Sequence, residues 1–234
     1  SFTNHKSEVI PAVKDLSFYI QQGETLGLVG ESGCGKSVTA LSLMQLIEEN
    51  TSSIQGEIVF EGENLNAFSE KEMHNIRGNK ISMIFQEPMT SLNPVHKIGK
   101  QISEVLFLHG FATKSNSKEK TIEILKKVGI PRAESIIEEY PHQLSGGMRQ
   151  RVMIAMAMAC NPKLLIADEP TTALDVTIQA QILELMKQLQ LEYNTAILLI
   201  THDLGVISEM ADRVIVMYYG QIVEQADVRT IFKN

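Results

Sequence analysis

Residues 30 to 37 combine glycines, a lysine and a serine at a spacing suited to holding phosphate groups. The segment reads Gly30-Glu31-Ser32-Gly33-Cys34-Gly35-Lys36-Ser37. Glycines let backbone N–H groups turn toward phosphate oxygens, and the helix predicted to start here adds positive potential. Lys36 can reach the β and γ phosphates of a nucleotide, and the Ser37 hydroxyl can ligate Mg²⁺. The alternative is an accidental glycine-rich turn. Such a turn would not require a strand before it and a helix after it, and both are predicted here.

We therefore expect this phosphate loop to bind ATP with Mg²⁺. The expected nucleotide contacts are Gly30, Ser32, Gly33, Cys34, Gly35, Lys36, Ser37 and Val38. Because Cys34 would sit at a helix N-terminus beside a lysine, we expect a thiol that is alkylated in the free protein and shielded by MgATP.

Three more strand-like runs are followed by polar side chains that suit phosphoryl chemistry. Gln86 follows one run, Asp168 and Glu169 follow a second, and His202 follows a third. In open α/β sheets ligands collect beyond the carboxyl ends of the strands, so we expect these side chains near the phosphate loop. Asp168 is suited to bind the metal ion, and Gln86 to bind the metal ion and water. Glu169 is suited to polarise the attacking water, and His202 to contact the γ-phosphate. Each alone could be structural, but together they favour ATP hydrolysis.

The elements that must position these residues follow an α/β pattern with a helical interruption. The predicted strands are Thr25 to Val29, Gln55 to Phe60, Ile81 to Phe85, Leu164 to Ala167, Thr195 to Ile200 and Arg213 to Met217. The predicted helices are Ser37 to Ile47, Ile98 to Leu108, Thr121 to Val128 and Ile178 to Leu191. Apolar runs separated by helical stretches are typical of a parallel sheet with crossover helices. Tyr218-Tyr219-Gly220 resembles the turn of a closing hairpin.

One further motif makes the pattern specific. Residues 144 to 151 read Leu144-Ser145-Gly146-Gly147-Met148-Arg149-Gln150-Arg151 and resemble the signature motif of ABC-type ATPases. By this resemblance the phosphate loop is the Walker A motif, and Leu164 to Glu169 is the Walker B motif with its glutamate. Gln86 then matches the Q-loop, Ala173-Leu174-Asp175 the D-loop and His202 the switch histidine. Met148 stands where the family most often has glutamine, and we expect little effect from it.

This resemblance implies the fold class and its division into parts. We expect an α/β fold with a RecA-like P-loop NTPase core, a small antiparallel β subdomain and an inserted α-helical subdomain. Residues 1–86 and 155–234 would form the nucleotide-binding core. Residues 87–154 would form the helical subdomain that carries the signature motif.

The resemblance also implies that two nucleotides lie between two such subunits. Ser145 can cap a helix while Gly146 and Gly147 leave backbone donors bare, which offers a second anion site. In the family this site contacts the γ-phosphate held by the opposite subunit, and the D-loop Asp175 lies at the same interface. The family stacks adenine on an early aromatic residue, and Phe2 is the candidate, with a core or frayed aromatic as the alternative.

Two segments narrow the resemblance to importers of oligopeptides, dipeptides or nickel. They are Gln86-Glu87-Pro88-Met89-Thr90-Ser91-Leu92-Asn93-Pro94 and Pro141-His142-Gln143. This subfamily implies a homo- or heterodimer of ATPase subunits on the cytoplasmic face of the cell membrane, held there by transmembrane permease subunits. An extracellular binding protein would deliver the substrate. The chain begins inside what resembles the first strand and ends before the extension that such proteins often carry, so we expect a longer parent chain.

Composition limits the competing functions. The formal charge of −7 argues against a general grip on nucleic acid, which needs a basic face. The longest apolar run, Ile154 to Cys160, falls short of the ~20 residues of a membrane span. The two cysteines suit a reducing cytosol. An ABC-type ATPase of DNA or ribosomes usually needs a long coiled-coil insertion or a basic extension, and neither the short helical insert nor the charge of −7 supplies one. A P-loop kinase leaves the signature motif and His202 without roles.

Overall fold

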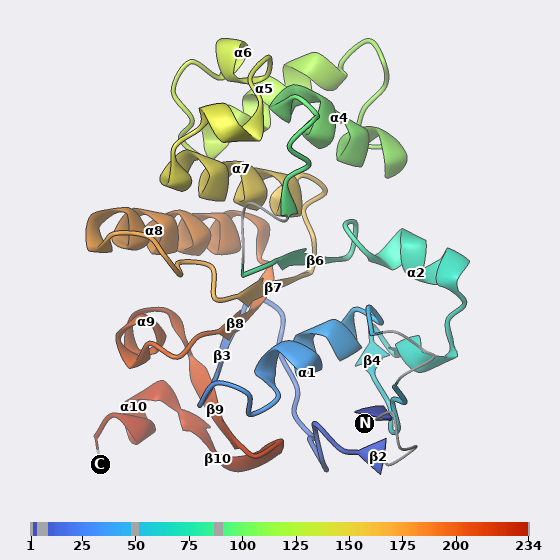
Figure 1. Ribbon diagram of the computed structural model, residues 1–234, viewed down its shortest axis with the longest axis vertical. Coiled ribbons are helices and arrows are strands. Elements are labelled where there is room, and N and C mark those ends of the chain that lie inside the picture. The colour runs from blue at the N-terminus through green and yellow to red at the C-terminus, as the bar shows by residue number, and fades with distance from the viewer. Residues whose placement is uncertain (1, 4–8, 48–51, 87–90, 234) are drawn as a thin grey trace.

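The computed structural model describes residues 2–3, 9–47, 52–86 and 91–233. Its main sheet has the strand order β10-β9-β3-β8-β7-β6 (Figure 1). The strands are β3 (Thr25–Gly30), β6 (Ile81–Ile84), β7 (Leu164–Asp168), β8 (Ala196–Ile200), β9 (Arg213–Tyr218) and β10 (Gln221–Asp227). All neighbours pair in parallel except β10, which forms an antiparallel hairpin with β9. The carboxyl ends of β3, β6, β7 and β8 therefore lie at one edge of the sheet.

Helices cover both faces of this sheet because its side chains are apolar on both. Leu26 and Leu28 of β3 pack in a cluster with α1 (Lys36–Leu43) and α2 (Glu70–Ile76). The neighbouring Val29 belongs to the cluster on the other face, with α7 (Gly146–Met158), α8 (Val176–Tyr193) and α9 (Leu204–Met210). Alternation with period two is what a buried strand requires. The short α10 (Val228–Ile231) follows β10.

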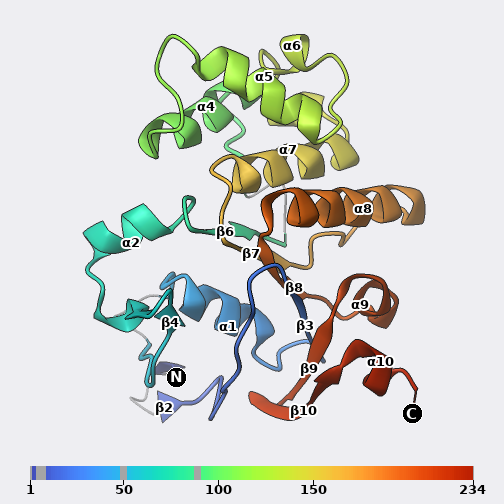
Figure 2. The ribbon, with the colours of Figure 1, turned by 180° about the vertical axis from the view of Figure 1, so that it is seen from behind.

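The middle of the chain is helical, as expected, and lies at one end of the molecule (Figures 1 and 2). It contains α4 (Ile98–Leu108), α5 (Ser117–Lys127), α6 (Ala133–Ile136) and the 3₁₀ turn η2 (Pro141–Gln143). The bounds of α4 agree with the sequence prediction, while α5 begins four residues earlier than predicted. The signature helix α7 continues to Met158 and packs against β6. It therefore joins the helical region to the sheet without a break.

Two short antiparallel ribbons accompany the sheet. They pair β1 (Phe2–Thr3) with β2 (Val9–Ile10), and β4 (Val59–Phe60) with β5 (Glu63–Asn64), which leads into η1 (Leu65–Ala67). The predicted strand from Gln55 to Phe60 was too long, since only its last two residues pair. Gly56 has a φ of 103°, and Glu61 and Gly62 turn the chain at φ 52° and 84°. These left-handed residues bound the segment from Glu57 to Phe60, which is shorter than the predicted strand.

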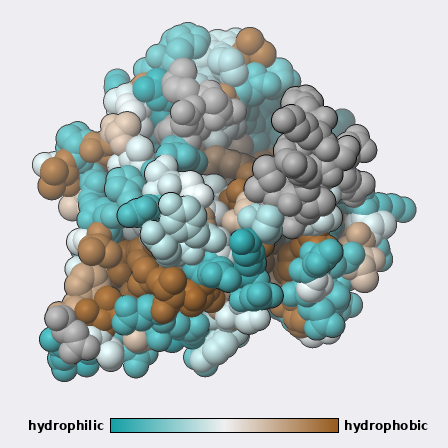
Figure 3. All heavy atoms as spheres, turned by 60° about the horizontal axis from the view of Figure 1, so that its bottom comes forward, coloured by the Kyte–Doolittle hydropathy of each residue, from teal (hydrophilic) through white to brown (hydrophobic). Residues whose placement is uncertain are grey.

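The end of the molecule that carries the β9–β10 hairpin is viewed in Figure 3, where hydrophobic side chains gather between hydrophilic ones. Tyr218, Tyr219, Val223 and Phe232 are among the exposed large hydrophobic residues of β9, β10 and their surroundings. Across the described residues, the helices are too short or too polar to serve as a membrane span.

Candidate active site

The phosphate loop is held open by glycines at two points of close approach. A Cβ atom on Gly30 would lie 2.3 Å from the carbonyl oxygen of Met217, and one on Gly35 would lie 2.9 Å from that of Ala12. Both glycines also have left-handed φ angles, 155° and 105°. Larger residues would be strained at both positions. Ser32, Gly33 and Ser37 are exposed, as a ligand-binding loop requires, and Val38 is half-buried.

Lys36 closes the inside of the loop. Its Nζ atom donates hydrogen bonds to the carbonyl oxygens of Gly30 at 2.7 Å and Glu31 at 2.9 Å. The residue is only 7% exposed. A buried ammonium group needs such partners, and a phosphate could take their place. The lysine thus lies where the sequence places it, at the centre of the loop.

Cys34 does not offer the accessible thiol expected from the sequence. The residue is 5% exposed and its side chain packs in the core cluster with Leu28 and Ala40. Its sulfur lies 3.8 Å from Nζ of Lys36. The carbonyl oxygen of Cys34 accepts a hydrogen bond from Gly220 at 3.0 Å. Because the side chain of Cys34 is buried in the core beneath the loop, only its backbone is available to a nucleotide.

Asp168 provides a buried oxygen suited to a hard cation. It ends β7, and Oδ1 has no hydrogen-bond partner among the described residues. Burial raises the pKa of Asp168, while a hydrogen bond from Ser37 acts in the opposite direction. An unpartnered carboxylate oxygen beside a serine hydroxyl fits the oxygen ligands that Mg²⁺ prefers. Lys36 adds positive charge nearby.

Glu169 gathers the other predicted residues around its carboxylate. Its Oε2 atom accepts hydrogen bonds from Nε2 of Gln86 and Oγ1 of Thr172, both at 2.9 Å. Its Oε1 atom lies 3.1 Å from Nδ1 of His202. The Glu169 side chain is 16% exposed and that of His202 is 67% exposed. The carboxylate therefore sits at the edge of the solvent, where a water molecule can reach it.

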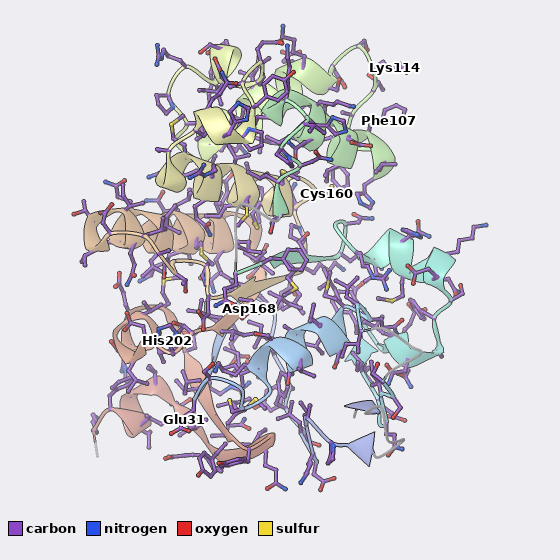
Figure 4. The ribbon with its side chains drawn as sticks, in the orientation of Figure 1. Glu31, Phe107, Lys114, Cys160, Asp168 and His202 are labelled. Atoms are coloured by element: carbon purple, nitrogen blue, oxygen red, sulfur yellow. The ribbon has the colours of Figure 1, made fainter. Side chains whose placement is uncertain are left out.

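Hydrogen bonds keep Glu169 ionised in spite of its partial burial. Burial raises the pKa of Glu169, but the bonds from Thr172, His202 and Gln86 outweigh it and leave the pKa below its usual value. An ionised carboxylate can accept a proton or orient water, which a protonated one cannot. Figure 4 shows Asp168 and His202 on the part of the molecule near the loop residue Glu31, with Phe107 and Lys114 far away in the helical region.

The signature residues form a second group around the N-termini of two helices. Ser145 caps α7 by accepting a hydrogen bond from the backbone N–H of Met148 at 3.3 Å. Asp175 caps α8 through the N–H of Ile178 at 3.0 Å. A Cβ atom on Gly147 would lie 2.9 Å from Cγ2 of Ile178. The signature and D-loop segments therefore pack on one another within the chain.

Two predicted features are not described in full. The backbone of Phe2 pairs with Ile10 in the β1–β2 ribbon, and its contact with adenine stays a prediction. Residues Glu87 to Thr90, part of the segment that suggested peptide or nickel importers, lie outside the described residues.

Sequence reasoning missed two side chains that contact Glu169 and Pro170. Thr172 bonds the carboxylate of Glu169, and Gln150 of α7 donates to the carbonyl oxygen of Pro170. Gln150 is also 2% exposed. Gln150 lies inside the signature motif and Thr172 between the Walker B and D-loop segments. Residue types alone do not reveal which neighbours a side chain reaches.

Comparison with known proteins agrees with this geometry. The family model described as ABC transporter matches residues 13–172. The oligopeptide transport ATP-binding protein AppD of Bacillus subtilis is 62% identical over 97% of this chain and 70% of its own length. OppD of the same organism, also an oligopeptide transport ATP-binding protein, is 59% identical over 99% of this chain and 65% of its length. The dipeptide transport protein DppD of Escherichia coli is 54% identical, over 94% of this chain and 68% of its length. The chain thus spans about two-thirds of these relatives.

Solved structures share the fold. The ATP-binding cassette MJ0796, a dimer bound to ADP and phosphate, superposes with a TM-score of 0.81 at 29% identity, covering 93% of this chain and 91% of that one. The cbiO1 protein of Clostridium perfringens, part of the ABC transporter complex cbiONQ, gives 0.80 at 27% identity, covering 95% and 84%.

Proposed function

The chain belongs to the ABC transporter family and has the fold of its ATPase cassettes, and we propose that it powers peptide import by hydrolysing ATP. The observation that carries the proposal is the convergence of Gln86, Thr172 and His202 on Glu169 next to a phosphate loop. The relatives AppD, OppD and DppD, all named for peptide transport, support peptide over nickel as the cargo.

The residues divide the work of hydrolysis among themselves. Lys36 and the loop N–H groups bind the phosphates, and the Phe2 ring stacks on adenine. Ser37, Gln86 and Asp168 hold Mg²⁺, which neutralises charge on the phosphate oxygens when it is bound. Glu169 orients the attacking water and accepts its proton, because hydrogen bonds keep this carboxylate ionised. His202 contacts the γ-phosphate from the exposed side of Glu169.

Two subunits complete each site. The backbone N–H groups of Gly146 and Gly147, which follow Ser145, contact the γ-phosphate held by the second subunit. Asp175 lies at the same interface. The dimeric state of the MJ0796 cassette supports this arrangement. The second subunit can be another copy of this chain or a homologous subunit, because both would bring signature residues to the opposite nucleotide.

The remaining partner is a transmembrane permease, which would hold this subunit at the cytoplasmic face of the membrane. The helical region, residues 87–154 in our division of the chain, carries an open groove of about 800 Å³. Its lining includes Val95, Lys97, Glu138, Tyr140, His142 and Gln143. Val95 is 72% exposed, and the rings of Tyr140 and His142 stack at 5.8 Å. In the sequence Gln86, which bonds to Glu169, precedes Pro94 of the groove lining by eight residues, and we propose that permease docking acts on Glu169 through Gln86. An extracellular binding protein would then act through the permease alone.

The test is ATP-dependent dimerisation of the Glu169→Gln variant, measured by sedimentation with and without MgATP. We expect this variant to bind ATP, to dimerise in it, and to turn over ATP ~10²-fold or more slowly than the parent chain. Ser145→Arg in the same background should abolish dimerisation, because it fills the anion site. The same runs include a homologous partner subunit.

A chain that stays monomeric in all runs and hydrolyses ATP at a concentration-independent rate would contradict the two-subunit site. Near-normal turnover by Glu169→Gln would show that Glu169 does not activate the attacking water. For the permease, Val95→Asp should lower permease-stimulated ATPase activity and leave ATP affinity unchanged, since Val95 is not part of the phosphate loop.

A further inference from the structure

Glu169 stands on an unusual piece of backbone. Its φ angle is 48°, in the left-handed region that residues with a Cβ rarely adopt. Its N–H donates to the carbonyl oxygen of Ile200 at 2.8 Å, and its own carbonyl accepts from Thr172 at 3.2 Å. Such a conformation persists only when its surroundings fix it in several places. The contacts on either side of Glu169 therefore decide where its carboxylate points.

One of these contacts comes from the signature helix. Gln150, six residues from the start of the signature motif at Leu144, donates from Nε2 to the carbonyl oxygen of Pro170. Pro170 directly follows Glu169, and both Pro170 and Gln150 are buried. Buried amide and carbonyl groups of this kind are costly to leave without partners. This hydrogen bond thus holds the peptide next to Glu169 against α7.

The beginning of α7 packs on the same loop. Leu174 lies 3.9 Å from the position of a Cβ atom on Gly146, and Ile178 lies 2.9 Å from that on Gly147. The two glycines thus allow Leu174 and Ile178 to approach the backbone at the start of α7. The signature helix therefore contacts the segment from Glu169 to Asp175 at two places, through Gln150 and through Gly146.

We infer that Gln150 is a positioning residue that links the signature helix to Glu169 of the same chain. Through it, γ-phosphate bound at Ser145, in the partner's site, fixes the carboxylate that works in this chain's own site. The two sites of the dimer are then coupled by a hydrogen bond inside each subunit. This inference rests on the proposed function, because it needs Glu169 as the catalytic carboxylate.

Gln150→Met tests the link, because methionine has nearly the same length and shape but no N–H donor. We expect unchanged ATP affinity by calorimetry, and turnover in the assembled dimer lower by roughly 10 to 10²-fold, the effect of a small misplacement. Gln150→Glu, which sets an acceptor against the Pro170 carbonyl, should lose at least as much turnover. The matched control is Gln181→Met. Gln181 accepts a hydrogen bond from Arg151 of α7 at 3.1 Å but lies away from the Glu169 loop, so this variant should keep normal turnover.

A double-mutant cycle separates positioning from general damage to α7. In the Glu169→Gln background, Gln150→Met should cause no further loss of turnover, and ATP-dependent dimerisation should persist. Multiplicative losses, or loss of dimerisation, would show that Gln150 supports the signature helix alone and would overturn the inference. So would normal turnover by both Gln150 variants. If Glu169→Gln itself hydrolyses ATP normally, the proposed function fails first, which is a different result.

Discussion

The side-chain amide of Gln86 lies 2.9 Å from the carboxylate of Glu169, although 83 residues separate them in the chain. The two residues follow neighbouring parallel strands, β6 and β7, in which Ile84 pairs with Ala167. This register places both residues at the same edge of the sheet. A residue next to the helical region is thereby in direct contact with the residue that we propose activates water.

Gln86→Leu should lower ATP turnover by roughly 10 to 10²-fold, because Glu169 loses one of three hydrogen bonds and water loses a polar neighbour. Binding of ATP without Mg²⁺ should change little, since the side-chain amide of Gln86 bonds to Glu169. Steady-state turnover and calorimetry measure the two effects. An equal loss of affinity in the absence of metal would place Gln86 in the binding site itself.

Lys36→Ala should abolish ATP binding or weaken it severely. The loop loses its cation, and the carbonyl groups of Gly30 and Glu31 lose a shared donor. Calorimetric titration with MgATP is the measurement. Lys163→Ala is the control, since Lys163 pairs with Glu61 away from the site and should bind ATP as the parent does. Equal ATP affinities for the two variants would contradict the assignment of residues 30 to 37 as the phosphate-binding loop.

Thr172→Val should slow turnover about 10-fold while ATP affinity stays unchanged, because it removes a hydroxyl donor from Glu169 at nearly constant volume. Thr172→Ser keeps the hydroxyl and should restore most of the rate. Single-turnover kinetics compare the three proteins. If serine is as slow as valine, the methyl group of Thr172 matters more than its hydrogen bond.

Gly147→Ala should weaken ATP-dependent dimerisation and destabilise the fold by about 1 kcal/mol, the lower range for an overpacked site. The new Cβ atom would meet Cγ2 of Ile178 at 2.9 Å and push α7 from α8. Adding Ile178→Leu removes that branch and should recover part of both losses. Denaturant unfolding and sedimentation are the measurements. If the double variant shows no recovery, contact of the alanine with Ile178 is not the cause of the losses.

Burial raises the pKa of Cys160 to about 11 from an ordinary value of 9.0. The thiolate is the reactive form, so Cys160 of the folded protein should label slowly at pH 8 and rapidly after unfolding. The unfolded thiol ionises first as pH rises, so stability from this group should be complete below pH 9 and decline between pH 9 and 11. Cys160→Ala should flatten that decline. A folded protein that labels quickly at pH 8 would contradict the buried position.

The sequence alone determined the chemistry and most of the scaffold of this protein. Glycine spacing requires a particular loop, and period-two and helical apolar patterns are local, so the phosphate loop, the sheet strands around it and α4 could be predicted. The signature motif could be recognised because its residue types and their order carry the information. These features depend on neighbours within a few positions of one another.

Only the tertiary structure decided which side chains meet. Cys34 is a loop residue in the sequence, yet its thiol lies under the loop because the strand before it directs the chain over the core. Thr172 and Gln150 reach the Glu169 loop only because β7, α7 and α8 pack together. Contacts between distant segments are set by the relative placement of whole elements, and no local pattern of residues encodes that placement.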